Sequence, residues 1–167
     1  MNTKVPQSKQ KVVHQFIFVE VPSELVVGEL MAWDKSSWWP KKCAIKHVRK
    51  ASAIELGITY QGKISGLLGP SWEAEVTKFV SGRRIEYTFR RGALKGYESI
   101  SIDWRYNGTR IDYELHYEIN GIHNQILWIF LYEKTFSANM KMILEAFKKH
   151  VVQLYQQQQE KGLEGQG

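Results

Sequence analysis

A chain of 167 residues, 43% hydrophobic and 24% charged, is long enough to form one globular domain with a buried core. Its net charge of +6 would suit nucleic acid or an anionic membrane surface. No nucleic-acid-binding motif is recognisable, however, and we interpret the basic residues as a solvated surface. The single cysteine, Cys43, excludes an internal disulfide and indicates a reducing, cytoplasmic environment.

The N-terminal part predicts a tail followed by a strand. Residues 1–10 are polar and lack the apolar core of a signal peptide, so we expect a flexible tail. Residues 11–20 alternate like a strand, with His14, Phe16 and Phe18 on one side and valine and isoleucine on the other. Because both sides are apolar, we expect the strand to be partly covered on both.

Two short helices are expected after this strand. Ser23 is a good N-cap for a helix over residues 24–33, and residues 34–39 predict a second helix that Pro40 ends. Trp38 and Trp39 cannot both point inward from so short a helix. We therefore expect one of them at a cavity rim or a surface contact.

From Cys43 onward the pattern changes to strand alternation. Six strands are expected, over residues 44–50, 54–60, 72–77, 84–90, 99–106 and 111–119. Asn107 and Gly108 predict a tight hairpin turn between the last two. Strands joined by short turns predict an antiparallel meander with one solvent-exposed face and one apolar face.

The C-terminal part predicts a long amphipathic helix over residues 135–159. Its apolar stripe recurs at steps of three and four: Phe136, Met140, Ile143, Leu144, Phe147, Val151, Leu154 and Tyr155. The preceding run, residues 122–133, is either an extension of this helix or a flap. We expect part of it to cover a cavity, with Trp128 or Phe130 near the entrance, unless it is an ordinary buried turn.

This order of elements resembles the START-like (Bet v 1-like, SRPBCC) superfamily over residues 12–157. The resemblance is carried by the strand-to-helix passage at residues 18–24, by Trp38-Trp39-Pro40, by the strand at 72–76 and by the terminal helix. It implies an α+β helix-grip fold, with a curved antiparallel sheet of about seven strands wrapped around the C-terminal helix. The domain would span residues 11–159, followed by a flexible tail, 160–167. A cavity between sheet and helix is implied as well.

Residue parity on the strands, the stripe of the long helix and the apolar run at residues 122–133 give the candidate ligand-binding residues. They are Phe16, Phe18, Tyr60, Trp72, Tyr87, Phe89, Ile102, Trp104, Tyr113, Tyr117, Trp128, Met140 and Phe147. The inward tyrosines matter because a buried phenol needs a hydrogen-bond partner and orients a ligand.

Catalytic chemistry is weakly indicated. Hydrolase, zinc-protease and phosphate-loop motifs are absent, and the five histidines lack metal-ligand spacing, so we expect no metal and no cofactor. His14 is the best candidate for a general base if its side of the strand faces the cavity, whereas His116 is expected on the wet face.

We expect the protein to bind an apolar small molecule such as a lipid, quinone, sterol or polyketide, with transient membrane contact but no nucleic-acid partner. One alternative is a polyketide cyclase or aromatase, which would require an acid–base pair within hydrogen-bonding distance inside the cavity. Another is a protein-interaction module using Trp38, Trp39 and the basic residues 41–50.

Overall fold

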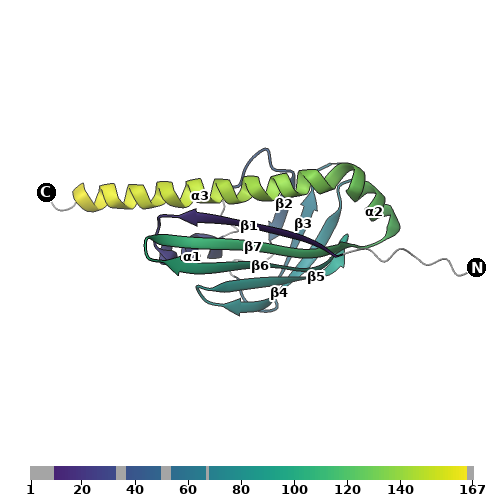
Figure 1. Cartoon of the computed structure of the whole chain (residues 1–167), viewed down its shortest axis with the longest axis horizontal. Coiled ribbons are helices and arrows are strands. Elements are labelled where there is room, and N and C mark those ends of the chain that lie inside the picture. The colour runs from purple at the N-terminus through teal and green to yellow at the C-terminus, as the bar shows by residue number, and fades with distance from the viewer. Residues whose placement is uncertain (1–9, 33–36, 50–53, 67, 165–167) are drawn as a thin grey trace, which may run out of the picture.

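The computed structural model describes residues 10–32, 37–49, 54–66 and 68–164, which form a curled antiparallel sheet around a long helix (Figure 1). In chain order the elements are β1 (Lys11–Val19), α1 (Ser23–Met31), β2 (Ile45–Arg49), β3 (Thr59–Ile64), β4 (Ser71–Val80), β5 (Arg84–Gly92), β6 (Leu94–Arg105), β7 (Gly108–Ile119), α2 (Ile122–Leu127), η2 (Trp128–Tyr132, a π-helical turn) and α3 (Glu133–Glu164). The predicted α+β helix-grip architecture is confirmed.

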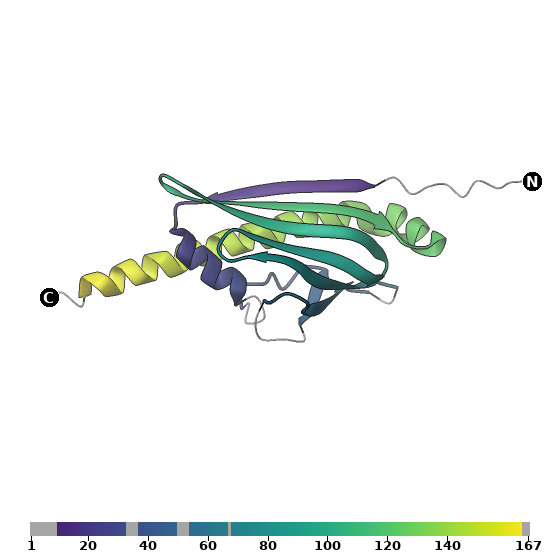
Figure 2. The same ribbon diagram turned by 90° about the horizontal axis from the view of Figure 1, so that it is seen from below.

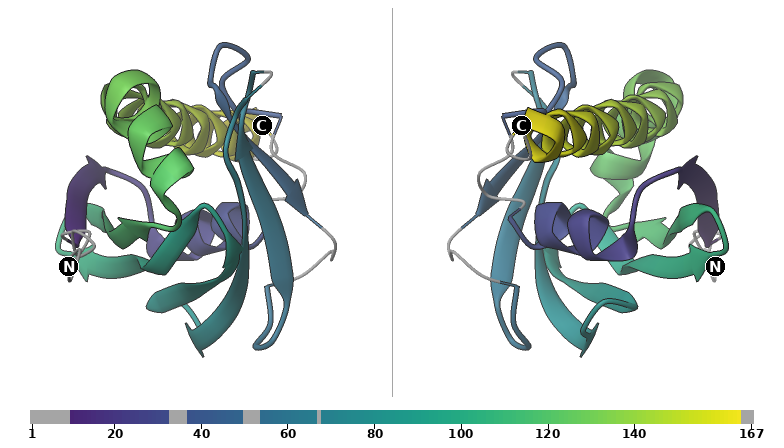
Figure 3. Two further views of the ribbon diagram at one scale, coloured as in Figure 1. Left: turned by 90° about the vertical axis from the view of Figure 1, so that its right-hand side faces the viewer. Right: turned by 90° about the vertical axis from the view of Figure 1, so that its left-hand side faces the viewer.

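The sheet has seven strands in the order β1-β7-β6-β5-β4-β3-β2, and all neighbours are antiparallel. Strands β2 to β7 form a meander, while β1 pairs with β7. Seen end-on, the sheet curls so that α3 and α1 lie on its concave side (Figure 3). The register of β4 with β5 shifts near Ala74 and near Val76, and such bulges bend a strand.

Alternation of side chains decides which residues face α3. In β7, Ile111, Tyr113, Leu115 and Tyr117 are buried, and the residues between them are partly exposed. Successive side chains of a strand point to opposite faces, so the apolar half of the pattern faces the helix. The predicted hairpin before β7 is present, but its two loop residues are Tyr106 and Asn107, one position earlier than predicted, and Gly108 already pairs with Arg105.

Helix α3 buries most of the predicted stripe, namely Phe136, Met140, Ile143, Leu144, Phe147 and Val151. It ends at Glu164 rather than near Gln159, and its C-terminal part extends beyond the sheet (Figure 2). α2 and η2 continue the helix backward, so residues 122–132 are the extension that the sequence offered as one of two outcomes.

Three local predictions need correction. Pro22, not Ser23, is the N-cap residue of α1, and no side chain caps this helix. Strand β3 begins at Thr59 rather than at residue 54, because the chain first turns at Gly57, whose φ is +81°. The second short helix, predicted over 34–39, lies largely outside the described residues, and the adjoining residues 37–39 form a turn and bend.

Candidate functional site

A cavity of about 50 Å³ lies between the inner face of the sheet and α3. Helix α3 contributes Met140, Ile143, Leu144 and Phe147, and α1 contributes Leu30. The rest of the lining is Trp39, Ile58, Tyr60, Val76, Tyr87, Glu98, Ile100, Ile111 and Tyr113. A largely hydrocarbon wall with a few convergent polar groups is the usual make-up of a small-molecule site.

Glu98 is the acidic residue of this lining. It lies on β6 opposite Tyr87 of β5, and parity with Ile100 directs its side chain inward. Tyr60 of β3 donates a hydrogen bond to Oε1 of Glu98, and Tyr113 of β7 donates one to Oε2 at 2.9 Å. Protein surrounds Glu98, although part of its surface stays accessible because it borders the cavity.

Burial sets the protonation of this cluster. It raises the pKa of Glu98, while the hydrogen bonds from Tyr60 and Tyr113 act in the opposite direction. Burial also raises the pKa of Tyr60 and of Tyr113 well above 10, and the neighbouring Glu98 charge adds to both shifts. The two phenols therefore stay protonated as donors, and Glu98 holds its proton to higher pH than an exposed glutamate does.

Contacts between elements hold the cavity wall in place. The Tyr60 and Tyr87 rings meet edge to face with centroids 5.0 Å apart, and Trp39 Nε1 donates to the Ile45 carbonyl at 3.1 Å. His150 of α3 lies 2.7 Å from the Glu29 carboxylate of α1. These contacts join the sheet, α1 and α3 around one space.

Solved structures share this architecture. The protein TTHA0849 from Thermus thermophilus aligns over 86% of this chain and 99% of its own, with a TM-score of 0.66 and 17% identity. A norcoclaurine synthase point mutant from Thalictrum flavum aligns over 88% and 97%, with a TM-score of 0.62 and 12% identity. Major latex-like protein 151 from Panax ginseng aligns over 77% and 96%, with a TM-score of 0.51 and 7% identity. The chain has the Bet v 1-like, helix-grip fold.

At these identities the likeness concerns the fold alone, and neither a protein-family model nor a curated protein sequence matches the chain. Within the described ranges, no helix combines the length and hydropathy needed to cross a bilayer. Nor do the described His, Cys, Asp and Glu side chains gather in groups of three that could hold a metal ion.

The helix-grip cavity brings together five of the candidate ligand-binding residues: Tyr60, Tyr87, Tyr113, Met140 and Phe147. Trp72, Tyr117 and Trp128 lie instead in an aromatic cluster around Phe136, where Trp128 and Phe136 have ring centroids 5.2 Å apart. Phe89 and Ile102 are buried in the core but are not part of the lining.

Three candidates lie on the surface side of the fold, and their inward placement was wrong. Phe16 and Phe18 project from the outer face of β1, because Ile17 and Val19 take the inner face. Phe16 is 58% exposed, and the Arg110 guanidinium lies 4.3 Å from its ring centroid. Trp104 is 62% exposed, because the β6–β7 hairpin carries it to a surface groove away from the cavity.

The histidine candidate shares the outer face. His14 is exposed, and its Nε2 lies 3.2 Å from the Asp112 carboxylate, so the condition for a cavity base is not met. His116 is partly buried rather than freely exposed, since its ring stacks on Tyr97 at 4.7 Å between centroids. Cys43 is buried, and burial raises the pKa of its thiol, which disfavours a reactive thiolate.

Sequence reasoning missed Glu98, the residue on which the polar cluster centres. The signal was present: counting back two positions from the inward Ile100 places Glu98 on the same face. Trp39, in contrast, fulfils the expectation that one tryptophan of the pair lies at a cavity.

Proposed function

We propose that the chain binds a small, mostly apolar molecule in the cavity between the sheet and α3. The observation that carries this proposal is a cavity lined mostly by hydrocarbon, into which the described residues Tyr60, Glu98 and Tyr113 bring a polar cluster. One neighbour of the same fold, norcoclaurine synthase, was solved in complex with a transition-state analogue, which adds support for small-molecule binding.

The cavity volume limits what enters without rearrangement. About 50 Å³ accommodates a few water molecules or a small polar group, and it is smaller than the cavity of about 150 Å³ that holds a benzene molecule. A lipid, quinone, sterol or polyketide is larger. For such a ligand, α1 or α3 would have to move away from the sheet to lengthen the cavity.

Analysis of the purified protein tests this proposal. We expect native mass spectrometry and organic extraction to find a co-purifying small molecule, and added lipids or quinones to quench tryptophan fluorescence through Trp39. Leu144→Phe, which fills the cavity from α3, should weaken quenching, whereas Leu131→Phe at an exposed position should not. Absence of both a bound molecule and any quenching would contradict the proposal.

A second candidate function, a cyclase or aromatase, gains support from the same polar cluster. Glu98 and its phenol partners are an acid–base group within hydrogen-bonding distance inside the cavity. A carboxyl group with a raised pKa can donate a proton to a substrate carbonyl and take one back. Incubating the extracted compound with the protein separates the two functions, because an enzyme changes its mass and a carrier returns it unaltered.

The protein-interaction alternative receives less support. Trp38 packs against Phe147 with ring centroids 5.1 Å apart, and Trp39 lines the cavity. Both tryptophan side chains therefore pack partly against the interior of the molecule and are only partly available on its surface.

A further inference from the structure

Among the described residues, the lining of the cavity supplies Glu98 with hydrogen-bond donors but with no positively charged side chain. Among the described residues that line it, none is a lysine, arginine or histidine. In the part of the chain that the structure describes, the groups around Glu98 are the phenols of Tyr60, Tyr87 and Tyr113 from the sheet, and hydrocarbon from α1 and α3. An ionised carboxylate buried without a counter-charge is strongly disfavoured. A ligand that brings a positive charge would remove this penalty.

The hydrogen-bond geometry suits the ionised form of Glu98. Each carboxyl oxygen accepts one phenol hydrogen bond, so the partners are already arranged around a carboxylate. A carboxylate offers about four lone-pair positions, and two phenols occupy about half of them. The remaining positions are available to a donor that enters the cavity.

The wall of the cavity suits a cation as well. Rings of Trp39, Tyr60, Tyr87 and Phe147 line it, and the faces of aromatic rings attract ammonium groups. A volume of about 50 Å³ admits an aminomethyl group beside Glu98, and the apolar body that carries the amine requires the same movement of α1 or α3 as any larger ligand.

We propose that the cavity selects ligands that carry a primary amine on an apolar body, with the ammonium group paired to Glu98. This rests on the proposed function, since it specifies the ligand of the same cavity. When the ammonium ion enters, a protonated Glu98 loses its proton to the solvent and becomes the carboxylate partner. Binding therefore releases up to one proton per ligand below the raised pKa of Glu98, and none above it.

Three probes with one hydrocarbon body test the inference: 2-phenylethylamine, 2-phenylethanol and ethylbenzene. Calorimetric titration in two buffers of different ionisation enthalpy measures both affinity and proton release. We expect the amine to bind about tenfold or more tightly than the alcohol, as for a charge-assisted hydrogen bond, and to release protons. Glu98→Gln should reduce amine binding to the level of the alcohol and abolish proton release.

Two further variants separate recognition from damage to the fold. Glu86→Gln removes a carboxylate that pairs with Arg84 on β5 outside the cavity, and it should leave all three affinities unchanged. Tyr113→Phe removes one phenol donor and should reduce the affinity for the amine more than the affinity for the alcohol. Circular dichroism checks that this variant keeps its fold.

The outcomes distinguish this inference from the function on which it rests. If the alcohol and hydrocarbon bind but the amine binds no tighter, amine selection is wrong and cavity binding stands. If Glu98→Gln reduces the affinities for the amine and for the alcohol equally, Glu98 has only a structural role and the inference is overturned. If none of the probes binds, the proposed function fails together with it.

Discussion

At the scale of single residues, Glu98 makes stability depend on pH with a definite sign. Burial raises its pKa above the ordinary value of 4.5, so the folded chain binds this proton more tightly than the unfolded chain. The resulting contribution is complete below pH 4.5 and is lost as pH rises through the raised pKa. We expect urea denaturation at a series of pH values to show this fall in the free energy of unfolding, and Glu98→Gln to remove it.

Two other carboxylates provide the comparison. The free energy of unfolding of Glu86→Gln should still fall as pH rises, because Glu86 lies outside the cavity beside Arg84. Hydrogen bonds from Arg110 lower the pKa of Asp112 below 3.8, so its contribution is present above that pH and is lost as pH falls further. The contributions of Glu98 and Asp112 to the free energy of unfolding therefore change in opposite directions as pH rises, and they do so in different pH ranges. An unchanged pH profile in Glu98→Gln would show that Glu98 is not buried as described.

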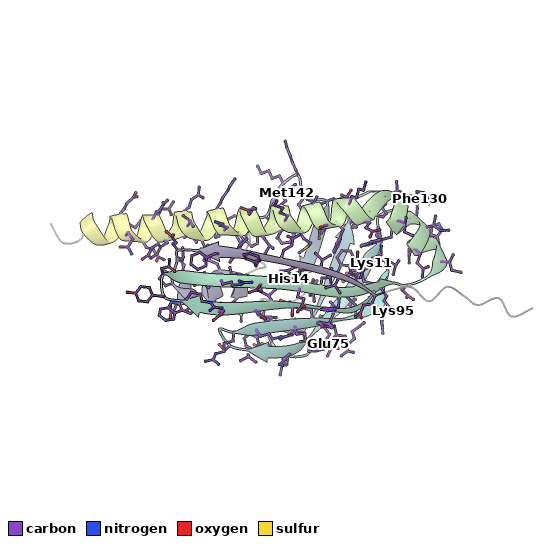
Figure 4. All side chains as sticks on the ribbon, viewed as in Figure 1. Lys11, His14, Glu75, Lys95, Phe130 and Met142 are labelled. Carbon is purple, nitrogen blue, oxygen red and sulfur yellow. The ribbon has the colours of Figure 1, made fainter. Side chains whose placement is uncertain are left out.

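At the scale of elements, the helical segment formed by α2 and η2 has two unlike faces. Trp128 is fully buried against Tyr117, Tyr132 and Phe136, whereas Phe130 is 80% exposed (Figure 4). Neither residue lines the cavity in this structure, so the expectation that one of them lies at its entrance is not met.

Paired substitutions measure this difference between the faces. Trp128→Ala should cost about 3–5 kcal/mol of unfolding free energy, because it removes a large buried ring. Phe130→Ala should change stability by no more than about 0.5 kcal/mol, as is usual for exposed positions. Chemical denaturation gives both values. Faster ligand exchange in Trp128→Ala without loss of stability would instead support a gate.

How far the sequence predicted each element depends on whether the signal was local. Strand alternation is local, and it gave the inner faces of β5 and β7 and the stripe of α3 correctly. In β1, Phe16 and Ile17 are both apolar, and only the fold decides which of them is covered. Glu98 was missed because an acidic residue in a strand is normally solvated. The phenols that make its burial tolerable come from β3 and β7, far away in sequence.

At the scale of the whole molecule, the cavity and the exposed apolar face lie in different places along the long helix. Cavity-lining residues of α3 run from Met140 to Phe147, and the aromatic cluster around Phe136 separates them from α2. Beyond this cluster the apolar side chains of the segment point outward: Ile122, Ile126, Ile129, Phe130 and Leu131 are all more than half exposed. Surfaces of this kind usually mark an interaction.

We expect an anionic lipid surface to be the partner of this face, because of the charge around it. The chain carries a net charge of +6, and Lys95 lies at the same end of the molecule as Phe130 (Figure 4), together with Lys11, which is paired with Glu133. Lys134 is exposed one helical turn after Phe130. An apolar helix face beside basic side chains inserts shallowly into a bilayer and is attracted to anionic head groups.

We therefore expect the protein to sediment with vesicles containing phosphatidylserine and much less with phosphatidylcholine alone. Added salt should weaken the association, because it screens the contribution of the lysines. Phe130→Ser combined with Ile126→Ser should abolish sedimentation and leave ligand binding in the cavity intact, since neither residue lines it. Val80→Ser, at an exposed position on β4, is the matched control and should sediment like the wild type. A double variant that sediments normally, or a wild type that forms dimers through this face in light scattering and ignores vesicles, would contradict the expectation.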